Sequence, residues 1–238
     1  MKYAVSSYIS TLTLESLDQF LMKSVIVFGK GSLALRICRF FLESSDFELL
    51  GIVPSGESQI PYFSLIDFAN QHDVPLIELE DLHRYDKSNV DLGFSCFFDL
   101  ILGAKHIEKF KLVLNIHNSL LPSYRGTLPI NWALENGETV HGVTIHQIID
   151  GGIDSGPIYN QIEFPVLTDD EVIDVYRRCV KYGWTIFQET ISNIESIEAI
   201  PQDDSKSSTY FSASTPLLKE RRWFVRDGMD EPEEMLPL

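Results

Sequence analysis

An amide and an imidazole stand two residues apart near the middle of the chain, at Asn115 and His117, and a carboxylate follows at Asp154. If Leu112–Leu114 is the end of a buried strand, this i, i+2 spacing projects the amide and the imidazole to the same side as the chain leaves the sheet. The amide can donate to a developing oxyanion, and the imidazole titrates near neutral pH. Asp154 can orient that imidazole and stabilise its charged form. Together they are the groups needed to move an acyl group from one nitrogen to another.

The segment after His117 is expected to form a rigid loop. Leu120–Pro122 and then Tyr124–Gly126 follow it, and proline and glycine restrict the backbone there. A histidine by itself is more often structural, but this setting favours a catalytic role for His117. His141 and His146 lack metal-ligand spacing. On an expected strand, His146 is interpreted as a packing or hydrogen-bonding residue.

The loop Asp150–Gly156 has three glycines in seven residues. Glycines let backbone N–H and C=O groups approach a planar ligand closely. A simple connection between two strands remains the alternative interpretation. Two carboxylates in one loop would also suit glycoside hydrolysis, but no second carboxylate pattern elsewhere in the chain supports that chemistry.

The turn Gly29–Ser32 follows the first expected strand. Its spacing, GxGxxA up to Ala34, resembles a dinucleotide-binding fingerprint, but no clear acidic residue closes the next strand to hold a ribose. A helix N-terminus that accepts a phosphate is better supported. A tight turn with no ligand stays open as well.

Composition excludes several classes of protein. A chain of 238 residues with 44% hydrophobic residues can bury a substantial α/β core. The net charge of −16 gives no general attraction for nucleic acid or anionic membranes, which disfavours a tRNA substrate. No apolar run approaches the roughly 18 residues of a membrane span, and the N-terminus does not resemble a signal peptide. The expected location is therefore cytoplasmic.

The three cysteines, Cys38, Cys96 and Cys179, are far apart and form no CxxC pair. Each lies in an apolar run, so the sequence predicts buried free thiols and no zinc site.

Strands and helices alternate through the first half of the chain. Strands are expected at residues 24–29, 47–53, 75–77, 90–98 and 111–116, with a helix over 33–42. This order predicts an α/β fold, a mostly parallel Rossmann-like sheet with helices on both faces. Two further strands are expected at 142–148 and 157–164. Thr168 is the expected N-cap of a long helix that ends near residue 192.

Three parts of the chain are distinguished. Residues 1–23 are interpreted as an N-terminal extension with one apolar helical face, residues 24–200 as the catalytic domain, and residues 201–238 as a short C-terminal extension. The last part contains an apolar-basic segment, residues 217–226, which fits either an interface or a solvated face.

The motifs Asn115–Gly126, Gly142–His146 and Asp154–Gly156 together resemble the formyltransferases that use 10-formyltetrahydrofolate. The resemblance is strong over residues 90–165 and implies the formyltransferase fold, with 10-formyltetrahydrofolate as co-substrate and no metal. It implies that Asn115, His117 and Asp154 are the catalytic trio, and that the Leu121–Pro122 bond is cis. The implied folate pocket comprises Cys96, Phe97, Phe98, Leu121, Pro122, Asp150, Gly151 and Gly152.

Within that family, Arg125–Glu138 is most similar to enzymes that formylate amino sugars carried on nucleotides. Glycinamide ribonucleotide transformylases normally have a histidine-bearing segment after Arg-Gly, where this chain has Thr127–Trp132. Methionyl-tRNA formyltransferases carry a C-terminal barrel of about a hundred residues, and only 37 residues follow Pro201 here. The expected substrate contacts are Gly29, Gly31, Ser32, Tyr124, Arg125, Asn131 and Trp132.

The function implied by the resemblance is formyl transfer to the amine of a dTDP- or UDP-linked 4-amino sugar. Such an enzyme would serve surface polysaccharide biosynthesis, for example of O-antigen or lipopolysaccharide. Glycinamide ribonucleotide formylation, formyltetrahydrofolate hydrolysis and a non-catalytic folate-binding module are the alternatives. No nucleic-acid or membrane partner is expected, and a homodimer is left open.

Overall fold

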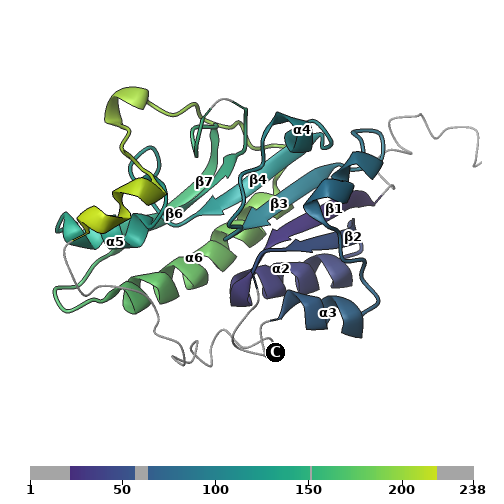
Figure 1. Ribbon diagram of the computed structural model, residues 1–238, viewed down its shortest axis with the longest axis horizontal. Helices are drawn as coiled ribbons and strands as arrows, with labels where there is room; N and C mark the ends of the chain where they lie inside the picture. Colours follow the sequence, from purple (N-terminus) through teal and green to yellow (C-terminus); the bar gives the residue numbers. More distant parts are fainter. Residues whose placement is uncertain (1–21, 57–63, 151, 219–238) are drawn as a thin grey trace, which may run out of the picture.

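The computed structural model describes residues 22–56, 64–150 and 152–218, built around a six-stranded sheet (Figure 1). The strand order is β2-β1-β3-β4-β6-β7. The first four strands run parallel, and β6 and β7 are antiparallel to their neighbours. The predicted α/β class with a mainly parallel sheet is confirmed. The strands are β1 (Lys23–Gly29), β2 (Phe47–Pro54), β3 (Leu92–Cys96), β4 (Leu112–His117), β6 (Val140–Gln147) and β7 (Ile158–Pro165).

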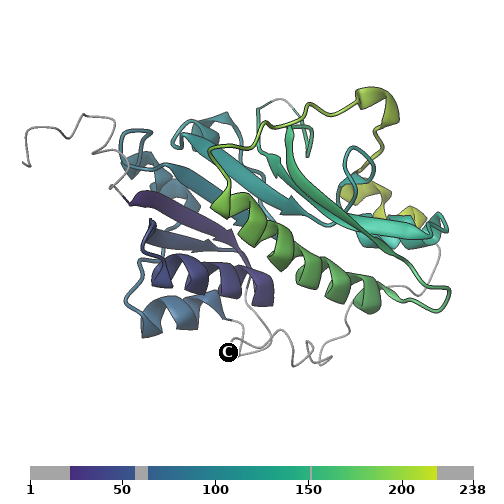
Figure 2. The same cartoon turned by 180° about the vertical axis from the view of Figure 1, so that it is seen from behind.

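One face of the sheet carries the helices α2 (Gly31–Glu43), α3 (Leu65–Gln71) and α6 (Val172–Ser192), and Figure 2 shows α2 and α6 from behind. Leu33, Ile37 and Phe41 recur every four residues in α2, so they share its buried stripe.

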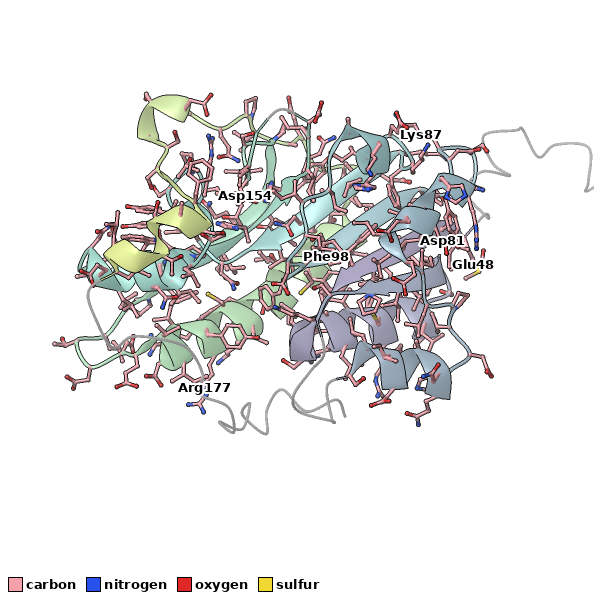
Figure 3. The ribbon with its side chains drawn as sticks, viewed as in Figure 1. Glu48, Asp81, Lys87, Phe98, Asp154 and Arg177 are labelled. Carbon is pink, nitrogen blue, oxygen red and sulfur yellow. The ribbon has the colours of Figure 1, made fainter. Side chains whose placement is uncertain are left out.

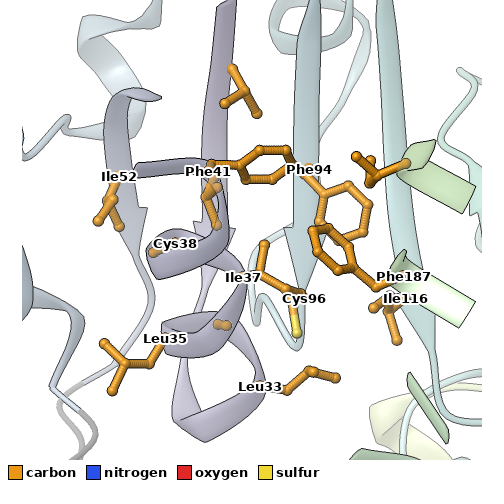
Figure 4. Packing of buried hydrophobic residues seen from close by; sticks show 14 of the residues in the cluster. Leu33, Leu35, Ile37, Cys38, Phe41, Ile52, Phe94, Cys96, Ile116 and Phe187 are labelled. Carbon is orange, nitrogen blue, oxygen red and sulfur yellow. The ribbon is translucent and has the colours of Figure 1, made fainter. Parts of the chain in front are cut away.

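The core under these helices is rich in aromatic side chains. Phe41 of α2, Phe94 of β3 and Phe187 of α6 are fully buried and meet edge to face, with ring centroids 5.0 to 6.3 Å apart (Figure 4). Replacing one of them by alanine would cost about 3–5 kcal/mol. This core fixes β3, and with it the neighbouring strand β4, against the helices.

The opposite face has its own core beneath shorter elements. Because side chains alternate along a strand, Val25 and Val27 of β1 enter the first core while Ile26 and Phe28 enter the second. The covering elements are the 3-10 helix η3 (Leu79–Arg84) and α4 (Ala104–Ile107). Helices therefore lie on both faces, as predicted.

Two local predictions are wrong. The expected strand at 75–77 is a single bridge between Leu76 and Ile52, because the segment only touches the edge of β2. Helix α6 begins at Val172, with Glu171 as N-cap in a capping box, and not at Thr168. The intervening turn is held by Asp170, whose carboxylate accepts bonds from Arg178 and from the Leu167 N–H.

The segment after Pro201 contributes to a second, two-stranded sheet. It forms η4 (Asp204–Lys206), β8 (Thr209–Tyr210) and η5 (Ser212–Leu217), and β8 pairs with β5 (Arg125–Gly126). The ring of Tyr210 stacks between Tyr124 and Trp132, and Trp132 belongs to α5 (Pro129–Glu135). Residues far apart in the sequence thus meet beside the end of β4.

Within the described ranges, no helix combines the length and apolar character needed to cross a lipid bilayer. The amphipathic helix expected in residues 1–23 lies almost wholly outside the described residues, as does most of the apolar-basic segment 217–226.

Candidate active site

A cavity of about 580 Å³ opens beside the ends of β3, β4 and β6. Asn115, His146 and Asp154 lie along its wall, and Asp154 and Phe98 are labelled in Figure 3. Residues from the C-terminal segment, Tyr210 to Ala213, close another side. Much of the remaining wall is apolar and suits a flat, aromatic ligand. These apolar lining side chains are Phe98, Leu100, Ile101, Leu102, Ile148, Ile149 and Ile153.

Asn115 faces His146 because the two residues are partners across the antiparallel pair β4–β6. The Nδ2 of Asn115 lies 3.1 Å from Nε2 of His146. The other ring nitrogen, Nδ1, lies 3.0 Å from the carbonyl oxygen of Gln147 and must carry the proton to donate to it. In this neutral form Nε2 accepts from the NH2 group of Asn115.

Asp154 lies between two imidazoles. Its Oδ2 is 3.4 Å from Nδ1 of His117, and its Oδ1 is 3.4 Å from Nε2 of His146. The Gly126 N–H also donates to Oδ2, at 2.8 Å. Burial by itself would raise the pKa of Asp154, but the two imidazoles and the Gly126 N–H outweigh it and hold that pKa well below its usual range. The carboxylate is therefore ionised at neutral pH.

His117 lies behind Asp154, away from the cavity wall. It is 7% exposed, and its Nε2 lies 2.8 Å from the carbonyl oxygen of Tyr124. Both ring nitrogens thus face oxygen acceptors, and a protonated ring can donate to both. In this arrangement His117 acts on the cavity through Asp154.

The loop between His117 and β5 is tightly held. The Thr144 hydroxyl donates to the Ser119 carbonyl at 2.6 Å and accepts from the Leu121 N–H at 3.2 Å. The bond between Leu121 and Pro122 is cis, as the family resemblance implied. The rigid loop expected from the sequence is confirmed by these contacts.

The predicted folate contacts divide into two groups. Phe98, Asp150 and Gly152 line the cavity. The other predicted contacts with a described position are not on the wall of the cavity. Phe97 packs on Tyr176, Cys96 and Leu121 are buried, and Pro122 is half-buried. Gly151 lies outside the described residues.

The predicted acceptor contacts are away from the cavity wall. Gly29, Gly31 and Ser32 form the turn between β1 and α2, where Lys30 binds Asp99, a residue of the wall. Tyr124, Arg125, Asn131 and Trp132 are buried beneath the wall. The Arg125 guanidinium binds Gln202 and Asp204. Their roles as substrate contacts stay predictions.

Sequence reasoning did not single out Gln202 or Tyr210, and it expected only packing or hydrogen bonding of His146, whose ring does form hydrogen bonds. The alternating pattern placed His146 on a strand, but its position opposite Asn115 depends on the β4–β6 register. Gln202 and Tyr210 lie in the short C-terminal segment, and no local motif marks either of them.

In the described part of the chain, no group of three or more His, Cys, Asp or Glu side chains is arranged to hold a metal ion. The three cysteines are buried and take part in no disulfide, as predicted.

The chain belongs to the formyl transferase family, whose model matches residues 49–191, more than half of the chain. The methionyl-tRNA formyltransferase of Synechococcus sp. (strain JA-3-3Ab) is 33% identical over 215 residues, covering 83% of this chain and 65% of the relative. The chain thus spans about two thirds or less of the length of the first curated relatives it matches.

Two solved structures resemble this chain over about four fifths of its length. One is WlaRD, a sugar 3N-formyl transferase solved in the presence of dTDP and 5-N-formyl-THF, with 29% identity and a TM-score of 0.71 over 82% of this chain and 71% of that chain. The other is the N-formyltransferase from Helicobacter canadensis in complex with folinic acid and dTDP-3-aminofucose. It has 27% identity and a TM-score of 0.69 over 81% of this chain and 72% of that one.

Proposed function

We propose that the protein transfers the formyl group of 10-formyltetrahydrofolate to the amine of a nucleotide-linked amino sugar. The observation that carries the proposal is the convergence of Asn115, His146 and the ionised Asp154 on one cavity with apolar walls. The apolar walls suit the flat rings of a folate, and the polar groups suit the reacting formyl carbon.

In the proposed reaction, the unprotonated amine attacks the formyl carbon and a tetrahedral oxyanion forms. One N–H of the Asn115 amide is bound to His146, and the second donates to the oxyanion. The nitrogen that attacked is now positively charged and much more acidic than the free amine, so the ionised Asp154 can accept its proton directly or through water.

The proton then passes to N10 of the folate as the bond between N10 and the formyl carbon breaks. The products are a formamide and tetrahydrofolate, so atoms and charge balance. In this scheme His117, whose Nδ1 lies beside Oδ2 of Asp154, can donate to the carboxylate and stabilise it while the proton moves.

Two observations support an amino-sugar acceptor. Two structural relatives at 29% and 27% identity were solved with dTDP or a dTDP-linked amino sugar. The net charge of −16 suits a small phosphorylated substrate better than a tRNA.

A nucleotide sugar and a folate are both charged molecules that do not cross membranes unaided, so the proposed site of action is the cytoplasm, upstream of surface polysaccharide assembly.

Methionyl-tRNA is the second candidate acceptor, because the curated relatives with 33% and 32% identity are methionyl-tRNA formyltransferases. It would need a local basic surface, and none of the residues that line the cavity is a lysine or arginine.

A competition experiment tests the acceptor. The protein receives 10-formyltetrahydrofolate with dTDP-linked 3-amino and 4-amino 6-deoxyhexoses, glycinamide ribonucleotide and methionyl-tRNA at equal concentration. We expect the amino sugars to be formylated preferentially. Preferential formylation of either other acceptor overturns the sugar assignment. A reaction without added amine marks a hydrolase, and no turnover with any acceptor marks a binding module.

A further inference from the structure

The side chain of Gln202 connects two segments of the site. Its Oε1 accepts from Nε of Arg125 at 3.1 Å and from Nη2 of Arg125 at 2.7 Å. Its Nε2 donates to the carbonyl oxygens of Asp154, at 2.8 Å, and of Gly156, at 2.7 Å. Both hydrogens of the amide and both lone pairs of its oxygen are thereby used.

These partners permit only one orientation of the Gln202 amide. If the amide were flipped, its NH2 group would face the Arg125 guanidinium and its oxygen would face two carbonyl oxygens. A glutamate at this position could bind Arg125 but could donate to neither carbonyl. Among the side chains of this length, only glutamine satisfies both sides.

The backbone of Asp154 needs such support. Its φ is 49°, in the left-handed region that is unfavourable for most residues with a side chain. Gln202 holds the carbonyl of this residue, while the Gly126 N–H holds its carboxylate. Gly126 directly follows Arg125 in the chain. Gln202, Arg125, Gly126 and Asp154 therefore form a closed ring of contacts.

We propose that Gln202 is a positioning residue for Asp154, and that the segment after Pro201 thereby takes part in catalysis without touching the reactants. This inference rests on the proposed formyl transfer. Gln202 is not among the residues that line the cavity, and its amide has no remaining donor or acceptor for a ligand. Its effect on the reaction therefore passes through Asp154, whose carboxylate must lie between His117 and His146.

The test compares Gln202→Leu and Gln202→Glu with the control Asp204→Asn. Leucine removes all four bonds, and glutamate keeps the acceptor for Arg125 but removes both donors. Asp204 accepts from the same guanidinium at 2.8 Å and does not contact Asp154 in the described structure, so its variant controls for a disturbed Arg125. Turnover is measured with 10-formyltetrahydrofolate and dTDP-3-aminofucose.

We expect both Gln202 variants to lower kcat by about 10- to 100-fold, since a small misplacement of a catalytic group can cost that much. The KM for formyltetrahydrofolate should change less than about threefold, and Asp204→Asn should stay within about twofold of the parent. The double variant Gln202→Leu/Asp154→Asn should be no slower than Asp154→Asn alone, because Gln202 acts only through Asp154.

A kcat within about threefold of the parent in Gln202→Glu overturns the inference, and so does a double variant much slower than Asp154→Asn. Gln202→Glu keeps the size of the side chain, so it serves if Gln202→Leu does not fold. Acid unfolding gives a readout that needs no activity. Asp154→Asn should lower the unfolding free energy of the parent protein, and it should lower that of the Gln202→Leu variant by a smaller amount. A parent protein that formylates no acceptor refutes the proposed function instead, and the acid-unfolding comparison still decides the role of Gln202.

Discussion

Asn115 and His146 lie directly opposite each other on β4 and β6, with Nδ2 of the amide 3.1 Å from Nε2 of the imidazole. In the neutral ring of His146, Nδ1 carries the proton and donates to the Gln147 carbonyl, and Nε2 accepts from the Asn115 amide. The amide of Asn115 is thus held with its NH2 group toward His146 and the cavity. The contact prepares an N–H donor before any substrate binds, which is the condition for effective oxyanion stabilisation.

Asn115→Ala should lower kcat by about 10²- to 10³-fold, the usual loss when one oxyanion donor is removed. Asn115→Asp should be at least as slow, because an aspartate cannot donate and places a second negative charge near Asp154. Steady-state kinetics provide the measurement, with Asn160→Ala as control, since Asn160 is a half-buried amide of β7 that binds Glu189 and does not line the cavity. If KM rose and kcat did not fall, Asn115 would be a binding residue.

His117→Ala should abolish detectable formyl transfer, with a loss of about 10²- to 10⁴-fold, while folding and folate binding persist. The reason is its position 3.4 Å from Oδ2 of Asp154, where it balances the charge of the carboxylate. Turnover and calorimetric binding of 5-formyltetrahydrofolate are measured side by side. A kcat within tenfold of the parent would remove His117 from the mechanism.

His141 should make the protein less stable as the pH falls. It is 2% exposed, its Nε2 lies 2.8 Å from the Asn118 carbonyl oxygen, and His117 is nearby. Burial lowers the pKa of His141 from about 6.5 to about 4. Between these pH values the unfolded chain binds a proton at His141 and the folded protein does not. The free energy of unfolding therefore falls as the pH drops from about 6.5 to about 4, by roughly 2–4 kcal/mol from this residue.

His141→Gln keeps a donor for the Asn118 carbonyl and removes the titration. Urea unfolding of both proteins at pH 7 and at pH 4.5 gives the measurement. We expect the variant to lose less stability between the two pH values than the parent. Equal losses would show that the His141 side chain is not kept neutral by burial.

Gly126→Ala should separate β5 from β8. Gly126 has φ +90°, and a Cβ there would lie 2.0 Å from the Tyr210 carbonyl oxygen. The expected loss in unfolding free energy is about 2–4 kcal/mol, with a fall in kcat because the Gly126 N–H also holds Asp154. Gly137→Ala is the matched control, since Gly137 has φ +72° but nothing within 4 Å of an added Cβ. It should cost only about 1 kcal/mol. If the two variants are equally stable, β8 does not pack against Gly126 in solution.

Elements with local signals could be predicted from the order of the residues alone. Alternating apolar residues and helical periodicity predicted β1, α2, β2, β4, β6 and β7 to within a few residues, since burial of one face dictates such patterns. The short-range motif from Asn115 to Gly126 likewise predicted a rigid loop beside a strand end. The N-terminus of α6 was misplaced, because the choice between Thr168 and Glu171 as N-cap depends on the contact of Asp170 with Arg178.

Which side chains meet depends on how distant segments of the chain pack together. The pairing of Asn115 with His146 depends on a strand register, and a shift of one residue would turn His146 to the other face. Gln202 reaches Asp154 from 48 residues away, through a segment that the sequence showed only as a polar tail. Such contacts arise from packing between distant parts of the chain, so no local pattern encodes them. They determine how the catalytic candidates are held, whereas the local motif determines which residues they are.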